Sequence, residues 1–250
     1  MIERRRWGRD ELLVVLRMYF TLDFGQLHAR QPTVIATADQ LGRGVNSVAM
    51  KANNFASLDP AITSTGRKGL VGASAADRAL WAEYSEQWDD LAVDAAIAWD
   101  CFGSSVDPVI VVPAGASESL SSMKVRRHQG FFRECVLANY QYRCAITGLE
   151  SPALLNASHI IPWSIDESRR ADPTNGLALN TLHDRTFDRG LISIDESLKM
   201  IVSSHLKSLA ENEFTESALL KWEGWELIPP FRYPPNSEAL EYHCDEIFVT

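Results

Sequence analysis

The stretch from residue 157 to residue 195 constrains the fold more than any other part of the chain. A short segment that contains His159 is followed by the polar, turn-forming sequence ESRRADPT, a second apolar segment, GLALN, and a helix-like stretch. We expect the two short segments to pair as an antiparallel β-hairpin with the helix packed on it. This arrangement brings the end of the first strand close to the first turn of the helix, although the two are far apart in sequence.

Three polar residues occur at intervals that suit such a hairpin. Asn175 follows His159 by 16 positions, and His183 follows Asn175 by 8. A histidine has an ordinary pKa of about 6.5 and can act as a base near neutral pH. Each histidine taken alone is also explained as a half-buried structural residue, so both interpretations stay open at this point.

Two breaks in composition divide the chain. Residues 103–124 are rich in Ser, Gly, Ala and Pro and predict a linker, and residues 228–238 contain four prolines and predict an extended arm. We therefore expect a helical domain at 1–102, a second domain at 125–227 and a C-terminal arm at 228–250. The predicted fold class is α+β.

Residues 35–58 have the pattern of a helix-turn-helix unit. The helical segments IATADQLG and VNSVAMKANNFASL are separated by a glycine turn at residues 42–44. The apolar side chains expected to form a shared core are Ile35, Leu41, Val45, Val48 and Phe55. The polar side chains expected to face DNA phosphates or base edges are Arg43, Asn46, Ser47, Lys51 and Asn54. A plain helical hairpin is the alternative interpretation.

The formal net charge of −9 is unevenly distributed. Counting by segment gives +4 for residues 1–70, −8 for 71–120, +1 for 121–199 and −6 for 200–250. The total argues against a polyanionic partner, but phosphate binding depends on the local potential of a groove. Nucleic acid therefore stays among the expected partners.

The four cysteines are scattered and form no CxxC pair, so we expect neither a disulfide framework nor a structural zinc ribbon. No apolar run approaches the length of a membrane helix, and the N-terminal sequence MIERRRWGRDELL lacks the apolar core of a signal peptide. These features predict a cytoplasmic protein with no membrane partner.

The motifs of residues 126–199 resemble those of the HNH endonuclease family, also called the ββα-metal or His-Me finger group. The resemblance rests on a His-Ile-x-Pro motif at His159, an Asn-Gly-Leu-x-Leu motif at Asn175 and a His-x-x-x-Phe-Asp-x-Gly motif at His183. Each motif alone is weak, but their order and spacing together are specific. The resemblance implies a ββα-metal nuclease domain preceded by the helical domain.

The resemblance also implies a role for each polar residue of these motifs. His159 would be the general base that takes a proton from the attacking water. Asn175 would hold the hairpin loop and orient the imidazole through its side-chain amide. His183 would bind a single divalent cation beside the scissile phosphate. Mg²⁺ or Mn²⁺ is the expected ion, with Zn²⁺ or Ni²⁺ as alternatives if imidazole ligands dominate.

One position departs from the family pattern. Many relatives have an aspartate or a second histidine immediately before the base, where this chain has Ser158. Asp188 is the candidate to supply the missing carboxylate, although its offset from His183 also suits a structural brace. Asp184 is expected to point away from the metal.

The N-terminal part resembles the leading domain of HNH restriction endonucleases, which favours a DNA-contacting helix-turn-helix. In the sequence STGRKG, Arg67 and Lys68 would grip phosphates, with a solvated turn as the equal alternative. The predicted function is a metal-dependent endonuclease acting on double-stranded DNA in restriction, and a homodimer is compatible with it. The alternatives are a DNA-binding regulator with an inactive nuclease fold and a nonspecific nuclease effector targeted by a partner.

Overall fold

The structure is a computed structural model that describes residues 5–102 and 120–249, with side chains from residue 125 onward in the second range. Two compact units divide the chain, Met1–Phe131 and Phe132–Thr250. Most of the predicted linker at residues 103–124 lies outside the described residues. The helix α7 (Leu120–Asn139) contributes residues to both units.

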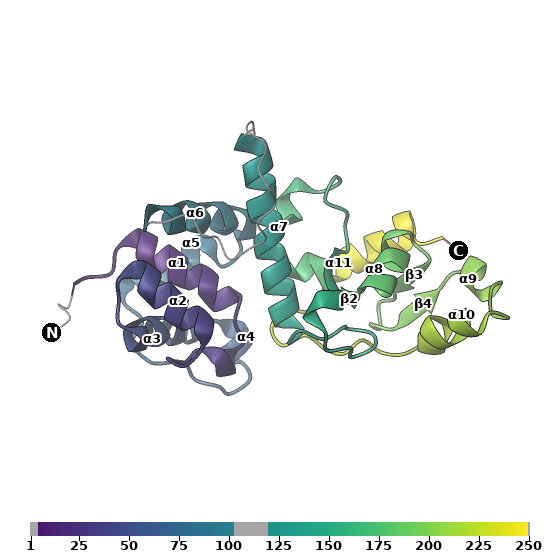
Figure 1. Cartoon of the computed structure of the whole chain (residues 1–250), viewed down its shortest axis with the longest axis horizontal. Coiled ribbons are helices and arrows are strands. Elements are labelled where there is room, and N and C mark those ends of the chain that lie inside the picture. The colour runs from purple at the N-terminus through teal and green to yellow at the C-terminus, as the bar shows by residue number, and fades with distance from the viewer. Residues whose placement is uncertain (1–4, 103–119, 250) are drawn as a thin grey trace. The chain divides into compact units, whose positions relative to one another are not determined.

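Helices build the described part of the N-terminal unit (Figure 1). They are α1 (Arg9–Phe20), α2 (Pro32–Leu41), α3 (Val45–Ala56), α4 (Pro60–Thr63), α5 (Ala75–Tyr84) and α6 (Trp88–Cys101). The central helix is α1, which is buried along most of its length and packs against α2, α3, α5 and α6. Because apolar side chains surround this helix on nearly every side, it forms the core of the unit.

The predicted helix-turn-helix corresponds to α2 and α3, which are separated at Gly42. Val48 and Phe55 are fully buried, as expected for the shared core. Ile35 was also expected there, but it is 38% exposed, and the buried face of α2 begins at Val34 instead. The buried residues of α2 are Val34, Thr37, Ala38 and Leu41, whose spacing of three or four positions defines one helix face, and Ile35 lies outside this face.

Two of the predicted DNA contacts are engaged inside the N-terminal unit. Arg43 forms an ion pair with Glu11 at 2.6 Å, and both side chains are 7% exposed. The Lys51 ammonium lies 2.9 Å from both carboxylate oxygens of Asp77, which is fully buried. Because a buried charge without a partner costs about 3–5 kcal/mol, these two ion pairs stabilise the packing of the unit and disfavour the predicted phosphate contacts.

The C-terminal unit contains the predicted hairpin and helix (Figure 1). Strand β1 (Leu155–His159) pairs antiparallel with β2 (Gly176–Asn180), and α8 (Thr181–Asp188) follows directly. A second hairpin joins β3 (Ile192–Ile194) to β4 (Met200–Val202). The ββα arrangement and the α+β fold class are confirmed.

The core of the C-terminal unit lies between α7, the first hairpin and α8. Its buried apolar side chains include Phe132, Val136, Leu155, Ile160, Leu177, Leu179, Phe187 and Ile192. Strand β2 is buried at four of its five positions, so both faces of the hairpin meet protein. This packing holds the first strand and α8 in place relative to each other.

The rest of the C-terminal unit consists of short helices and an irregular segment. The helices are α9 (Ser204–Lys207), α10 (Glu213–Ala218), α11 (Ser237–Tyr242) and a π-helical turn at His243–Ile247. The predicted arm at residues 228–250 folds back on this unit, because Ala239 and Leu240 belong to its core and Val249 donates a backbone hydrogen bond to Gly190.

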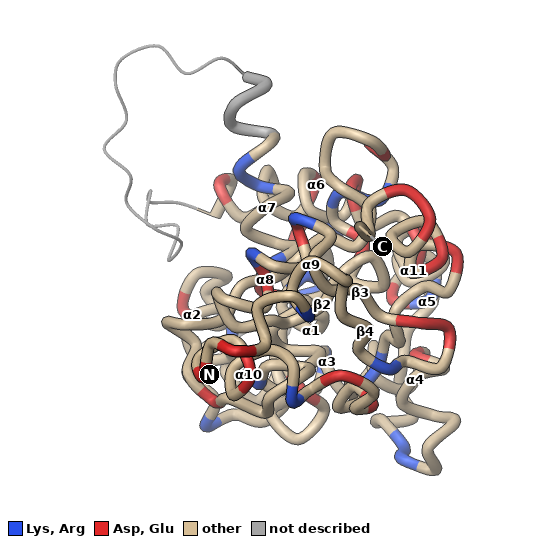
Figure 2. Tube along the Cα trace, turned by 90° about the vertical axis from the view of Figure 1, so that its right-hand side faces the viewer, with Lys and Arg blue, Asp and Glu red and all other residues tan. Residues whose placement is uncertain are grey.

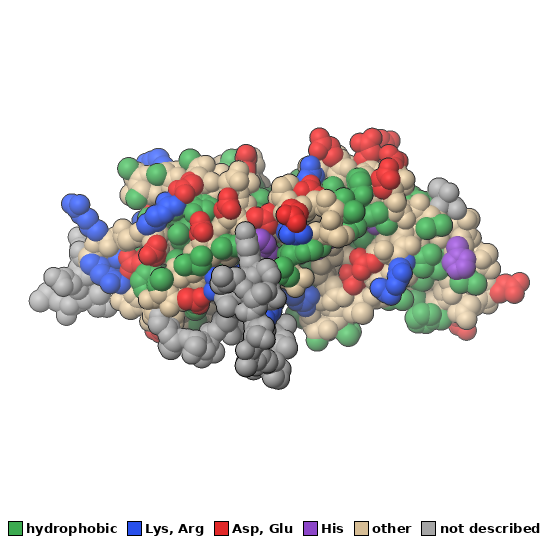
Figure 3. Space-filling view, turned by 90° about the horizontal axis from the view of Figure 1, so that it is seen from above, with side chains coloured by type: hydrophobic (Ala, Val, Ile, Leu, Met, Phe, Trp, Pro, Cys, Tyr) green, Lys and Arg blue, Asp and Glu red, His purple; other side chains and the backbone are tan. Residues whose placement is uncertain are grey.

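Charged residues of both signs are distributed along the described trace (Figure 2). On the face drawn in Figure 3, basic and acidic side chains are interspersed. Any contact of that face with a polyanion would therefore depend on local groups rather than on an extended basic surface. Within the described ranges, no helix combines the length and the apolar character needed to cross a membrane.

Gly190, which ends the Phe-Asp-x-Gly motif, touches the C-terminal segment. Its φ angle is +65°, and a Cβ atom there would meet the Ile247 carbonyl oxygen at 2.0 Å. We predict that Gly190→Ala lowers the free energy of unfolding through both backbone strain, about 1–2 kcal/mol, and displacement of the C-terminal segment, about 1–3 kcal/mol. Urea denaturation of the full chain measures the loss.

Gly224→Ala is the matched control for this variant. Gly224 has a φ angle of +76° and nothing within 4 Å of the added Cβ, so only the backbone strain applies. Equal losses of stability in the two variants would contradict a role for the contact between Gly190 and Ile247.

Candidate active site

His159 lies at the end of β1, opposite Gly176 in the β1–β2 pairing. A Cβ atom at residue 176 would meet Val136 and Phe132 of α7 at 2.4 and 2.8 Å, so only glycine allows α7 to approach this closely. The Phe132 ring stacks on the His159 ring, with the ring centres 3.7 Å apart and the planes 10° from parallel. The glycine of the Asn-Gly motif therefore makes room for the aromatic support of the imidazole.

The surroundings of the His159 imidazole determine which nitrogen can accept a proton. Nε2 lies 3.0 Å from the carbonyl oxygen of Arg170. Because a carbonyl oxygen only accepts hydrogen bonds, Nε2 carries the proton and Nδ1 keeps its lone pair. Burial lowers the pKa of His159 and outweighs the opposing effect of the Arg170 carbonyl. The imidazole is therefore neutral at neutral pH, which is the form that a general base needs.

Asn175 holds the loop after β1, but it does so through the backbone. Its Oδ1 accepts a hydrogen bond from the Ile161 amide at 2.8 Å, and its Nδ2 donates to the carbonyls of Ile161 and Arg169 at 3.1 and 3.3 Å. The expected amide bond to the imidazole is replaced by the carbonyl of Arg170. Asn175 thus orients His159 indirectly, by fixing the loop that carries this carbonyl.

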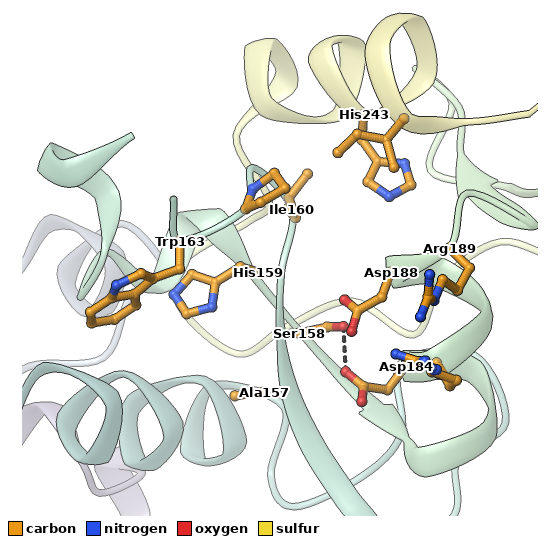
Figure 4. Close-up of a pocket in the computed structure, with 12 residues that line it drawn as sticks. Ala157, Ser158, His159, Ile160, Trp163, Asp184, Asp188, Arg189 and His243 are labelled. Carbon is orange, nitrogen blue, oxygen red and sulfur yellow. Dashed lines mark hydrogen bonds between the residues drawn. The ribbon is translucent and has the colours of Figure 1, made fainter. Parts of the chain in front are cut away.

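Asp184 faces β1, and the expectation that it points away is wrong. Ser158 donates a hydrogen bond from Oγ to one carboxylate oxygen of Asp184 at 2.6 Å, and Asn156 donates from Nδ2 to the other at 2.6 Å. Figure 4 shows Ser158 turned toward Asp184 and Asp188. Two donors from one strand therefore fix the orientation of the Asp184 carboxylate.

A cavity of about 430 Å³ joins these groups. Its walls include His159, Trp163, Asp184 and Asp188. In Figure 4 the His159 ring lies beside Trp163, on the other side of β1 from the two aspartates. Asp184 and Asp188 are four residues apart in α8 and share one face of that helix. Burial and, next, the charge of Asp184 raise the pKa of Asp188. The two carboxylates therefore form one electrostatic group, to which a cation would be attracted.

His183 is not among the residues that line this cavity. It is 1% exposed, and its Nδ1 lies 3.0 Å from Oδ1 of Asn180, the residue that caps the N-terminus of α8. The side chain of Asn180 also reaches Cys144 and Thr147. Nε2 of His183 is buried without a hydrogen-bond partner among the described residues, and burial lowers the pKa of His183 to about 4. The contact with Asn180 Oδ1 puts the proton on Nδ1 and leaves the Nε2 lone pair unengaged, so the metal contact of His183 stays a prediction, although His183 does not line this cavity.

His243 is a cavity residue that the sequence patterns did not indicate. It is 1% exposed and stacks on the Phe187 ring, with the ring centres 3.7 Å apart. Its Nε2 donates to the Phe187 carbonyl at 3.2 Å, and its Nδ1 lies 2.8 Å from Oγ of Ser193. His243 therefore supports the end of α8 that carries Asp188. It follows a proline-rich segment far from the hairpin, so no local pattern could have identified it.

The donors of the cavity fit a hard divalent cation. Each oxygen of Asp184 has more than one lone pair, so the bonds from Asn156 and Ser158 leave capacity for a metal ion. Among the described residues, no group of three or more His, Cys, Asp or Glu side chains is arranged to hold a metal ion. Mg²⁺ and Mn²⁺ suit such a site, because Mg²⁺ in particular keeps several water ligands and binds through one or two carboxylates and substrate phosphates.

The other predicted DNA contacts lie at the surface of the N-terminal unit. Asn46, Arg67 and Lys68 are exposed, and Ser47 and Asn54 are half-buried. Gly69 brings the loop that carries Arg67 and Lys68 against the end of α3, where a Cβ atom would meet the backbone of Ser57 at 2.3 Å. The loop and α3 are therefore neighbours on this unit.

The hairpin, α8 and the cavity coincide with a family match. A sequence comparison with curated proteins finds no match. Residues 144–195 match the family model described as HNH endonuclease, and this range includes β1, β2, α8 and β3. The C-terminal unit therefore carries a domain of the HNH endonuclease family at residues 144–195.

Proposed function

We propose that the protein is a metal-dependent DNA endonuclease with its active site in the cavity lined by β1, the loop that follows it, α8 and the C-terminal segment. The observation that carries this proposal is that a neutral imidazole and two carboxylates line the same cavity. Hydrolysis of a phosphodiester needs a base for the attacking water and positive charge beside the phosphate. His159 meets the first need, and the carboxylate pair can hold a cation for the second.

In this proposal, Nδ1 of His159 accepts the proton of the attacking water. The carbonyl of Arg170 stabilises the resulting imidazolium, because it accepts the hydrogen bond from Nε2. Phe132 and Trp163 restrict the ring to one orientation, since one stacks on its face and the other packs at its edge. A base held in this way needs little reorganisation before reaction.

Asp184 and Asp188 would hold the divalent cation. This assignment keeps Asp188 from the sequence analysis and replaces His183 with Asp184, because Asp184 lines the cavity and His183 does not. When bound, the cation stabilises negative charge on the phosphate and on the departing 3′ oxygen. Asn156 and Ser158 support the site by orienting the Asp184 carboxylate.

The N-terminal unit would position double-stranded DNA. The exposed residues Asn46, Arg67 and Lys68 and the half-buried Ser47 are the remaining candidates for phosphate or base contacts. A DNA-positioning unit joined to a nuclease domain supports a role in restriction of foreign DNA. A homodimer would place two active sites on one duplex, one for each strand.

His159→Ala is predicted to lower the rate of plasmid cleavage with Mg²⁺ by about 10²–10⁴-fold while DNA binding persists, because it removes the base. The pKa of His159 is lowered, so the imidazole stays neutral further into acid than an ordinary histidine. We therefore expect cleavage to be constant above about pH 6.5 and to fall only at lower pH. A gel assay of plasmid cleavage across a pH series measures both effects.

His205→Ala is the matched control, because His205 is an exposed histidine remote from the cavity lining. Its activity should equal that of the wild type. An active His159→Ala variant, or a cleavage rate that already falls above pH 6.5, would refute the assignment of His159 as the base.

Asp184→Asn is predicted to raise the Mg²⁺ concentration needed for half-maximal cleavage by at least about 10–100-fold, because a neutral amide is a poorer ligand than a carboxylate. His183→Gln should leave this concentration close to that of the wild type and should mainly reduce stability. Titration of Mg²⁺ in the cleavage assay separates the two. If His183→Gln raised the required Mg²⁺ concentration and Asp184→Asn did not, His183 rather than Asp184 would be the metal ligand.

A restriction enzyme should cut unmodified DNA into discrete fragments and should treat methylated DNA of the same sequence differently, because its contacts depend on base identity. We expect this outcome when the two DNA samples are digested in parallel and separated on a gel. Continuous smears from both samples would instead indicate a nonspecific nuclease.

A further inference from the structure

Two arginines of the C-terminal unit differ from the others in their contacts. Five of its seven arginines make contacts within the unit, namely Arg133 with a carbonyl, Arg143, Arg169 and Arg170 with carboxylates, and Arg232 with an aromatic ring. Arg185 and Arg189 are exposed, and their guanidinium groups form neither an ion pair nor a hydrogen bond with the described residues. These two cations are therefore free to bind an external anion.

Both arginines line the cavity that contains the two carboxylates. Each follows an aspartate directly in sequence: Asp184 and Arg185 lie within α8, and Arg189 is the C-cap residue next to Asp188, the last residue of that helix. In Figure 4 the Arg189 side chain extends on the same side of β1 as Asp188. The cavity thus offers positive groups for an anion next to the carboxylates proposed to hold a cation.

The nearby carboxylates do not neutralise these arginines by direct contact. Both oxygens of Asp184 accept hydrogen bonds from β1, and no ion pair within the described ranges joins either aspartate to Arg185 or Arg189. Arginine is suited to phosphate because its planar guanidinium donates two parallel hydrogen bonds. An arrangement of unpaired arginines beside a carboxylate pair therefore favours a ligand that carries several phosphates.

We propose that Arg185 and Arg189 bind two successive phosphates of the DNA strand that is cut, next to the scissile phosphate. The two residues are four apart in sequence, which places them one turn apart, about 6 Å along the helix axis. This separation is comparable to that between neighbouring phosphates of one strand. The inference rests on the proposed nuclease function and names two residues that would bind the phosphate backbone of its DNA substrate.

The test uses the full chain and a short fluorescent DNA duplex in EDTA, so that binding is measured without cleavage. Each neutralised phosphate adds about 0.9 to the slope of the logarithm of affinity against the logarithm of salt concentration. We expect Arg185→Gln and Arg189→Gln each to weaken binding by about tenfold and to reduce this slope by about 0.9. The double variant should reduce it by about 1.8.

The matched control is Lys199→Gln, which removes one exposed positive charge from the same unit. Its slope should stay within error of the wild type. Slopes of the arginine variants equal to that of the control would overturn the proposal. A double variant whose slope equals that of the single variants would overturn the assignment of two separate phosphates.

Conservative variants and kinetics extend the test. Arg185→Lys and Arg189→Lys should keep the salt slope but weaken binding, because the charge remains and the paired donors are lost. With Mg²⁺ present, the glutamine variants should raise KM more than they lower kcat, as expected when groups outside the reacting centre are removed. A reduced kcat at unchanged KM would contradict a role of the two arginines in binding the DNA backbone.

Failure of this proposal is distinguishable from failure of the proposed function. A wild-type protein that binds DNA with the expected salt dependence but never cuts it would refute the nuclease function and leave the arginine assignment standing. A wild-type protein that cuts DNA, with arginine variants that bind as well as the control, would refute the arginine assignment alone.

Discussion

The antiparallel pairing of β1 with β2 is the interaction on which the rest of the candidate site depends. Its register places His159 opposite Gly176, and the space left by this glycine admits Phe132, which stacks on the imidazole. The same pairing sets Asn175 beside the loop whose Arg170 carbonyl binds Nε2. A shift of one residue would turn every side chain of β1 to the opposite face. The register is therefore required for the site and for the fold alike.

In both units, charged side chains that already pair with another side chain of the same unit are candidates for a structural role. Those without such a pair are candidates for a functional role. In the N-terminal unit, Arg43 and Lys51 are held by buried carboxylates. In the C-terminal unit, the Asp184 carboxylate accepts hydrogen bonds from two neutral donors, Asn156 and Ser158, and forms no ion pair among the described residues. Ser158, which stands where many relatives have a ligand, acts here by orienting that carboxylate.

Several elements could be predicted from sequence because their signals are local. The hairpin with its following helix, and the break at Gly42, follow from apolar periodicity and turn residues. Other predictions failed where a side chain's direction mattered. Neighbouring positions in a helix differ by about 100°, so the sequence placed His183 near the site but could not show that Asp184 faces it. The same uncertainty of one position explains why Ile35 was expected in the core where the structure has Val34.

The sequence by itself determined the order of the elements and the pairing of β1 with β2, because periodicity and turn chemistry act between near neighbours. Its resemblance to a known family made His159 and Asn175 candidate site residues. Only the tertiary structure decided which face of α8 lines the cavity, that His243 supports it from the C-terminal segment, and that Arg43 and Lys51 are engaged within their unit. These features depend on contacts between residues far apart in the chain. Such contacts are set by packing, and packing leaves no local pattern.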